Sequence, residues 1–142
     1  GRFGDQRQVS RGEGVRAAIS AMTREHRPFY YLPDLDHGPK TAIFVPFFGV
    51  PAATVPGLSR IAKLSGAKVL PCVTRILPGG RGYVVRIEPP WAGFPTQDVG
   101  ADTRRMNAFI EAVALEIPEQ YLWMHKRFKT RPPGEPSPYR RK

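Results

Sequence analysis

Two acids that stand two positions apart are the residues of this chain best suited to chemistry. Asp34 and Asp36 lie in the stretch Phe29-Tyr-Tyr-Leu-Pro-Asp-Leu-Asp-His-Gly38, directly after aromatic residues that favour a strand. In an extended segment, residues i and i+2 project to the same side. Both carboxylates are therefore expected where a strand ends, the place where α/β proteins gather functional groups. A Pro-Asp turn with two solvated acids and a glycine at positive φ explains the same residues, and both interpretations stay open here.

The other reactive residue types form no complete site. The chain has one cysteine and three histidines, and no histidine stands at metal-ligand spacing from another histidine, a cysteine or an acid. We therefore predict no metal site and expect no cofactor. Asp36 and His37 are neighbours that would point opposite ways in an extended segment, which argues against an acid–base pair. Cys72, within Val69-Leu-Pro-Cys-Val73, is interpreted as a small core residue.

Apolar periodicity predicts the elements that position these groups. Helices are expected at about 12–25, 54–66 and 100–117. Strands are expected at 29–32, 42–45, 68–74 and 83–88, the last two as a hairpin around a glycine-rich turn. The predicted fold class is therefore α/β, a mixed sheet flanked by helices. We assign residues 1–131 to the folded part and 132–142, which are rich in proline and basic residues, to an extended tail.

Size and charge set the class of partner. With 142 residues, 41% of them hydrophobic, the chain is long enough for one domain with a core. No stretch approaches the roughly 20 apolar residues of a membrane span, and no signal peptide is visible. The formal net charge of +10 favours anionic partners: nucleic acid, phosphorylated lipid, an anionic membrane face or an acidic protein.

Four motifs taken together resemble the lipid A biosynthesis acyltransferases. They are Tyr31-Leu-Pro-Asp-Leu-Asp-His-Gly38, Phe44-Val-Pro-Phe-Phe-Gly49, Arg104-Arg-Met-Asn107 and the long run from Pro118 to Pro132. This family adds secondary acyl chains, such as lauroyl and myristoyl, to a lipopolysaccharide precursor in Gram-negative bacteria. The resemblance implies a fold like the C-terminal part of the glycerolphosphate acyltransferase sandwich. It also implies acyl carrier protein as donor, a phosphorylated lipid A precursor as acceptor, and no nucleic-acid partner.

The catalytic motif of that family, H-x-x-x-x-D/E, is absent from this chain. Five positions after the three histidines stand Tyr31, Ala42 and Thr130. The resemblance therefore implies that residues 1–131 are the C-terminal portion of an acyltransferase domain, inactive on their own because the general base is missing. It places the parent enzyme at the cytoplasmic side of the inner membrane, held there by a missing N-terminal part, with this portion itself soluble.

The resemblance also assigns roles to individual residues. Asp36 matches the second acid of the family's Pro-Asp-x-Asp motif and is expected to be catalytic. Arg2 matches a functional arginine of the family, with Arg7 as the alternative. The residues expected to bind substrate are Asp34, Lys40, Lys126, Arg127, Lys129 and Arg131.

The residues themselves leave two alternatives to these assignments open. In the first, Arg127 does not bind substrate but braces the Asp34–Asp36 loop as an internal ion pair. In the second, the chain is not part of an acyltransferase but a nucleic-acid-binding module, with Tyr121, Trp123 and Phe128 as stacking platforms.

Overall fold

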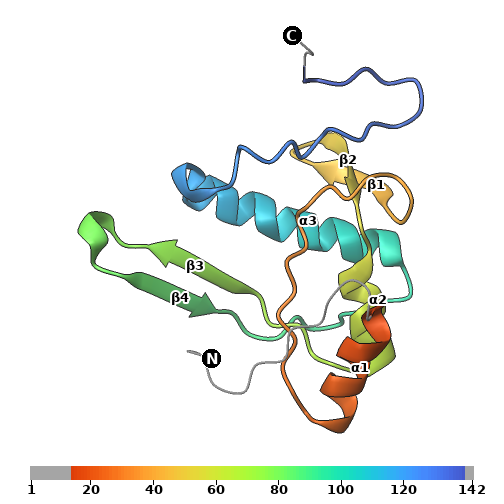
Figure 1. The fold of residues 1–142 in the computed structure, drawn as a ribbon, viewed down its shortest axis with the longest axis vertical. Helices are drawn as coiled ribbons and strands as arrows, with labels where there is room; N and C mark the ends of the chain where they lie inside the picture. Colours follow the sequence, from red (N-terminus) through yellow and green to blue (C-terminus); the bar gives the residue numbers. More distant parts are fainter. Residues whose placement is uncertain (1–13, 140–142) are drawn as a thin grey trace.

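The computed structural model describes residues 14–139. In chain order the elements are α1 (Gly14–Arg24), β1 (Ile43–Phe47), β2 (Val50–Thr54), α2 (Gly57–Ser65), β3 (Cys72–Ile76), β4 (Tyr83–Ile87) and α3 (Val99–Glu116) (Figure 1). Short 3-10 turns lie at Pro78–Gly80 and Pro118–Gln120. The three predicted helices, as far as their residues are described, and the β3–β4 hairpin are confirmed.

The strands form two separate two-stranded sheets, both antiparallel. In one, β1 pairs with β2 across the turn at Phe48 and Gly49; in the other, β3 pairs with β4. The predicted single mixed sheet is therefore wrong for residues 14–139. Each strand finds its partner across a short connection, so each hairpin forms by local pairing without joining the other.

The predicted strand at 29–32 is also wrong. Residues 28–35 donate and accept no backbone hydrogen bond within the described part of the chain. Aromatic residues favour a strand only when a neighbouring strand completes the hydrogen-bond ladder. Here no strand of residues 14–139 lies alongside, so the segment has β-favouring residues without β-structure.

α3 is the element that organises the core. Its N-terminus is capped by Asp98, whose carboxylate accepts from the N–H of Ala101. In its first turn, buried Asp102 accepts from the Ser59 hydroxyl (2.6 Å) and from the N–H of Thr96, which ties α2 and the preceding loop to α3. Further along, Asn107 donates to the carbonyl of Pro46 in β1 (3.0 Å). The residues of the resulting apolar core include Phe47, Ala52, Ala53, Ile61, Ala62 and Met106.

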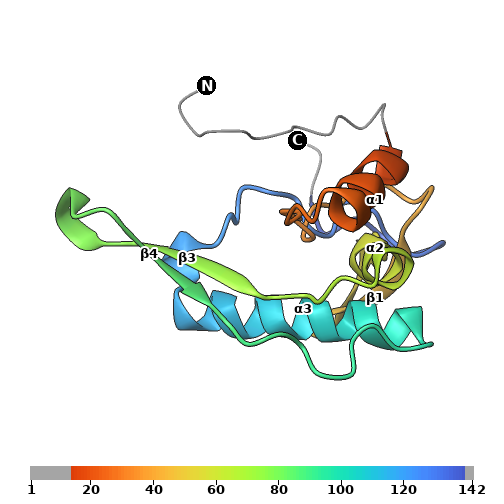
Figure 2. The ribbon, with the colours of Figure 1, turned by 90° about the horizontal axis from the view of Figure 1, so that it is seen from below.

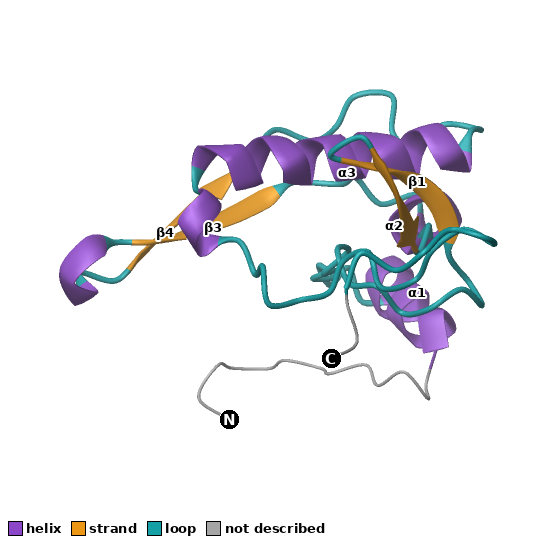
Figure 3. Cartoon of the chain, turned by 90° about the horizontal axis from the view of Figure 1, so that it is seen from above, coloured by secondary structure: helices purple, strands orange, loops and turns teal. Residues whose placement is uncertain are grey.

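The two hairpins lie differently against α3. In Figure 1, β1 and β2 sit above the helix, whereas in Figure 2 the β3–β4 hairpin runs alongside it and extends past its end. The loop before β1 and the segment after α3 lie on one side of α3, whereas the loop from β4 to α3 runs on the other (Figures 2 and 3). In residues 14–139 we find no helix both long and apolar enough to cross a membrane.

Candidate functional site

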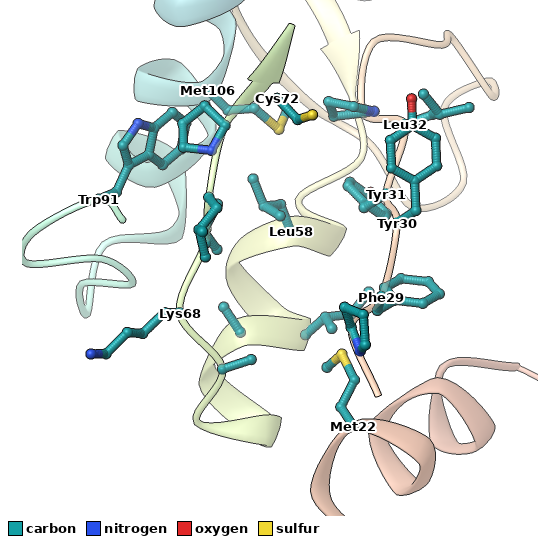
Figure 4. Close-up of a pocket in the computed structure, with 18 of the residues that line it drawn as sticks. Met22, Phe29, Tyr30, Tyr31, Leu32, Leu58, Lys68, Cys72, Trp91 and Met106 are labelled. Atoms are coloured by element: carbon teal, nitrogen blue, oxygen red, sulfur yellow. The ribbon is translucent and has the colours of Figure 1, made fainter. Parts of the chain in front are cut away.

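An apolar pocket of about 710 Å³ lies between α2, α3 and the chain segments 26–34 and 67–72 (Figure 4). Its volume is within the range of small-molecule sites, which are usually lined by apolar and aromatic side chains. α2 contributes residues at helical spacing, and α3 contributes a second stripe. The main lining side chains are Tyr31, Leu58, Ile61, Trp91, Met106, Phe109 and Ile110.

Two aromatic side chains of the pocket are held by specific contacts. The Trp91 ring packs edge-on against Phe94 and Phe109, and the guanidinium of Arg105 lies 4.9 Å from its centre. The Tyr31 hydroxyl lies so close to Gly57 that a Cβ there would be 2.4 Å from it. Burial raises the pKa of Tyr31, so this hydroxyl stays neutral at physiological pH.

A second pocket of about 340 Å³ continues along α3 towards Tyr121 and Leu122. The two pockets share Leu32, Asp34, Cys72, Phe109 and Ile110. Asp34 thus brings a carboxylate to an otherwise apolar junction. Burial raises the pKa of Tyr121, and the negative charge of Asp34 raises it further.

Cys72 is exposed, so its interpretation as a core residue is wrong. It begins β3 and borders both pockets. The prediction rested on its apolar neighbours, but the side chain stays exposed at the pockets that it borders.

Asp36 joins its loop to the C-terminal segment. The side chain is 2% exposed, and its oxygens accept from the N–H of Gly38 and from both the N–H and the hydroxyl of Thr130, all at 2.9 Å. Its own N–H donates to Nε2 of His125 (3.0 Å). Burial raises the pKa of Asp36, but these hydrogen bonds outweigh it and hold the pKa below its usual value. Asp36 is therefore ionised at neutral pH and holds two distant segments together.

His125 and Thr130 were not predicted as partners of Asp36. They lie 89 and 94 residues away from it along the chain, so no local spacing could reveal these contacts. The one available signal was that all three residues fall within the motifs that carry the resemblance.

Arg127 is the most deeply placed of the predicted substrate-binding residues. Its side chain is 3% exposed and donates to the carbonyl of Ala53 (2.8 Å) and to the hydroxyl of Thr54 (2.6 Å), both in β2. Its guanidinium lies 5.2 Å from the centre of the Phe47 ring. Burial lowers the pKa of Arg127, while Tyr121 and Asp34 oppose that effect. Arg127 is thus an internal brace, though its hydrogen bonds go to β2 and not to the two acids.

The other predicted substrate-binding cations differ in their exposure and in their contacts with the rest of the chain. Arg131 donates to the carbonyl of Pro51 (2.6 Å) and pairs with Glu135. Lys40, Lys126 and Lys129 are exposed, and the Lys126 ammonium lies 5.8 Å from the Tyr139 ring. Arg2 and its alternative Arg7 lie outside the described residues, and the substrate-binding and catalytic assignments stay predictions.

Two of the three proposed stacking aromatics are engaged inside the chain. The rings of Tyr121 and Phe128 lie 6.2 and 6.1 Å from that of Phe47, and Trp123 packs edge-on against Tyr121. They are therefore poorly placed as platforms for unstacked bases. Among residues 14–139 we also find no cluster of three or more histidine, cysteine or acidic side chains able to hold a metal ion.

Comparison with known proteins points to one family. Residues 2–130 match the family described as bacterial lipid A biosynthesis acyltransferase. The chain is 38% identical to the lipid A biosynthesis lauroyltransferase of Escherichia coli K12 over 140 residues, which are 98% of this chain and 45% of the relative. It is also 38% identical to the myristoyltransferase of the same organism, covering 99% of this chain and 43% of the relative. The chain thus spans less than half the length of these curated relatives.

Proposed function

Because the chain belongs to the bacterial lipid A biosynthesis acyltransferase family, we propose that it is part of an enzyme that moves a fatty acyl chain. The donor is acyl carrier protein, and the acceptor is a hydroxyl group of a phosphorylated lipid A precursor. Within the chain, the observation that supports this function best is the apolar pocket of about 710 Å³.

The pocket has the properties that an acyl chain requires. Its walls come from two helices and an aromatic segment, and the second pocket extends the apolar lining along α3. A hydrocarbon chain gains free energy from each methylene it removes from water, by about 0.8 kcal/mol. Asp34 lies at the junction of the two pockets and is our candidate for contact with the polar end of such a chain.

Exposed cations are proposed to attract the anionic groups of donor and acceptor. Arg127 and Arg131 are turned towards β2, where they donate to the carbonyls of Ala53 and Pro51. The exposed Lys40, Lys126 and Lys129 are therefore the described cations of this set best placed for external phosphate or carboxylate. Lysine acts on such groups as a point charge with three donors.

For Asp36 we propose a positioning role, because three hydrogen bonds from the protein occupy its oxygens. Arg2 remains our candidate for direct catalytic contact. We further propose that residues 1–131 are the C-terminal portion of a glycerolphosphate acyltransferase-like domain. The complete enzyme then works at the cytoplasmic face of the inner membrane.

Trp91 provides the test of the pocket. The chain has two tryptophans, Trp91 in the pocket and Trp123, which is 60% exposed. A brominated fatty acid should quench the fluorescence of the Trp123→Phe variant, which keeps Trp91, at concentrations that leave the Trp91→Phe variant unchanged. Equal quenching of both variants, or none of either, would exclude the pocket as the acyl site.

A transfer assay tests the proposal that this chain alone is inactive and that another part of the enzyme supplies the general base. The isolated chain should move no acyl group from acyl carrier protein, since loss of a general base alone costs about 10²–10⁴-fold in rate. Turnover by the isolated chain at the rate of a complete family member would contradict this part of the proposal.

A further inference from the structure

The two faces of the β3–β4 hairpin differ in what lies against them. Residues directly opposite in an antiparallel pair share a face, and Val73 stands opposite Arg86 while Ile76 stands opposite Tyr83. We define the outer face of the hairpin as Cys72, Thr74, Ile76, Tyr83, Val85 and Ile87, and the inner face as Val73, Arg75, Val84 and Arg86.

The inner face is the one tied to the rest of the chain. Arg86 pairs with Glu116 at the end of α3 (3.1 Å), and Val73 is half-buried. Gln120, just beyond α3, accepts from the N–H of Ile76 and donates to its carbonyl. These contacts hold the hairpin alongside α3, as Figure 2 shows.

Apart from Thr74 the outer face is apolar, and its large side chains are exposed. Ile76, Tyr83, Val85 and Ile87 are 54, 70, 55 and 65% exposed. Isolated exposed apolar side chains are ordinary, but contiguous apolar patches on a monomer usually mark an interaction site.

The outer face of the hairpin has the composition of a buried face, whereas the inner face carries Arg75 and Arg86. A strand with one solvated face alternates apolar and polar residues, whereas a strand covered on both faces has a nearly continuous apolar run. β4 places Tyr83, Val84 and Val85 in succession, but Arg75 and Arg86 interrupt the apolar run of both strands on the inner face, so only the outer face is apolar along its length, except at Thr74. The described chain supplies a layer, α3, on one side only.

We propose that the outer face docks a further polypeptide layer, which is the portion of a full-length family member that lies outside the matched segment. The matched residues make up 45 and 43% of the two Escherichia coli relatives, so more than half of each relative is available to form that layer. This inference rests on family membership and not on the acyl pocket.

The unpaired segment 28–35 supports the same occupant. Residues 28–34 line the pocket opposite Cys72 and Ile87, which belong to the outer face, so the segment borders the same concave region. Its backbone groups have no partner within the described residues, and Tyr30 and Leu32 are 75 and 61% exposed. A polypeptide can satisfy backbone donors and acceptors as well as cover apolar side chains, whereas a bilayer satisfies only the second need.

Cys72 is a built-in reporter for this docking, because it is the one cysteine of the chain and lies exposed on the outer face. The remainder of the Escherichia coli lauroyltransferase, made cysteine-free, is co-expressed with this chain as a separate polypeptide. Labelling of the Cys72 thiol should then slow by roughly tenfold or more, since it requires the interface to open. In the control Cys72→Ser/Leu64→Cys, the thiol stands on α2 at a site 67% exposed in the parent, and its labelling rate should not change.

Two neighbouring residues give the matched variants. Val85 on the outer face and Val84 on the inner face are 55 and 48% exposed. Val85→Asp should abolish co-purification and restore fast labelling of Cys72, whereas Val84→Asp should preserve both effects of the remainder. Neither change should alter the stability of the isolated chain by more than about 0.5 kcal/mol.

Three results would overturn the proposal. The first is an equal labelling rate with and without the remainder. The second is a dimer of the isolated chain that Val85→Asp dissociates, which would make a second copy the occupant. The third is Val85-dependent binding to phosphatidylglycerol vesicles without any effect of the remainder, which would make it a lipid surface. None of them bears on quenching at Trp91, so the pocket and the docking face can fail separately.

Discussion

The two hairpins of this chain are the same size but end in opposite surroundings. Each has two five-residue antiparallel strands. In β1–β2, the residues Val45, Phe47, Ala52, Ala53 and Thr54 are buried, whereas every residue of β4 is exposed. A hairpin's own residues therefore do not determine its burial, which depends on the segments that the rest of the chain places against it.

Distant segments cover β1–β2. Asn107 on α3 reaches Pro46, and two arginines of the C-terminal segment, Arg127 and Arg131, reach Ala53 and Pro51. Buried carbonyl groups are thereby satisfied by side chains. Among residues 14–139, the side-chain contacts to the β3–β4 hairpin come from near the end of α3, where Glu116 pairs with Arg86 and Gln120 contacts the backbone of Ile76. Substitutions in the two hairpins should therefore have unequal effects.

The largest difference is expected between Phe47→Ala and Tyr83→Ala. Phe47 is 1% exposed and contacts the rings of Phe48, Tyr121 and Phe128, so its truncation should cost about 3–5 kcal/mol of the free energy of unfolding. Tyr83 is 70% exposed, and its truncation should change that free energy by less than about 0.5 kcal/mol. Urea denaturation of both variants gives the values. Equal losses would mean that the hairpins are equally covered in solution.

Arg127→Met comes next, with Lys126→Met as its matched control. Met removes the charge and both hydrogen bonds to β2 while keeping much of the volume, and should destabilise the chain by about 2–3 kcal/mol. Lys126 is exposed, so the same change there should be nearly neutral. If Arg127 serves an external anion instead, thermal unfolding of the two variants will be alike and only anion binding will differ.

Asp36→Asn should cost about 1–2 kcal/mol, more than Asp34→Asn. An amide cannot accept all three hydrogen bonds from Gly38 and Thr130, because its NH₂ group turns a donor towards them. Since the folded pKa of Asp36 lies below the unfolded value of about 4, the ionised group stabilises the fold above that pH. This contribution disappears as the pH falls through the folded pKa.

The pH profile separates this role from a general loss of packing. Denaturation from pH 7 down to pH 2 should show the parent and Asp36→Asn converging in acid. A constant offset at every pH would show that the ionised form of Asp36 has no special partner. In a complete family enzyme, Asp36→Asn should also lower turnover more than Asp34→Asn, as expected of a positioning residue.

Local pattern was enough for the elements that depend on local interactions. The helices follow from apolar spacing, Gly66 ends α2 at φ 68° as its type predicts, and the Cys72–Ile87 hairpin follows from its glycine-rich turn. The resemblance supplied the family, which the comparisons confirm.

Long-range partners could not be predicted from pattern. The bond from Asp36 to Thr130 and that from Arg127 to Ala53 join residues more than 70 positions apart. The failures at 29–32 and at Cys72 share one cause, because both predictions assumed a neighbouring strand or layer that residues 14–139 do not supply.

The smallest expected effect concerns the wall that the pocket shares with α2. Gly57 has helical geometry in the first turn of α2, where alanine alone would stabilise the helix by roughly 0.5–1 kcal/mol. A Cβ there would meet the Tyr31 hydroxyl at 2.4 Å, so Gly57→Ala in the parent should lose that gain or become slightly destabilising. In the Tyr31→Phe background the hydroxyl is gone, and the nearest ring atom, 3.2 Å from the Cβ, has to shift by only a few tenths of an ångström, so the same substitution should be less destabilising. A double-mutant cycle by thermal unfolding therefore expects a coupling of about 0.5–1 kcal/mol between the two positions. Its absence would mean that the Tyr31 ring does not rest on α2 in solution, and that this side of the pocket is as unsupported as the outer face of β3–β4.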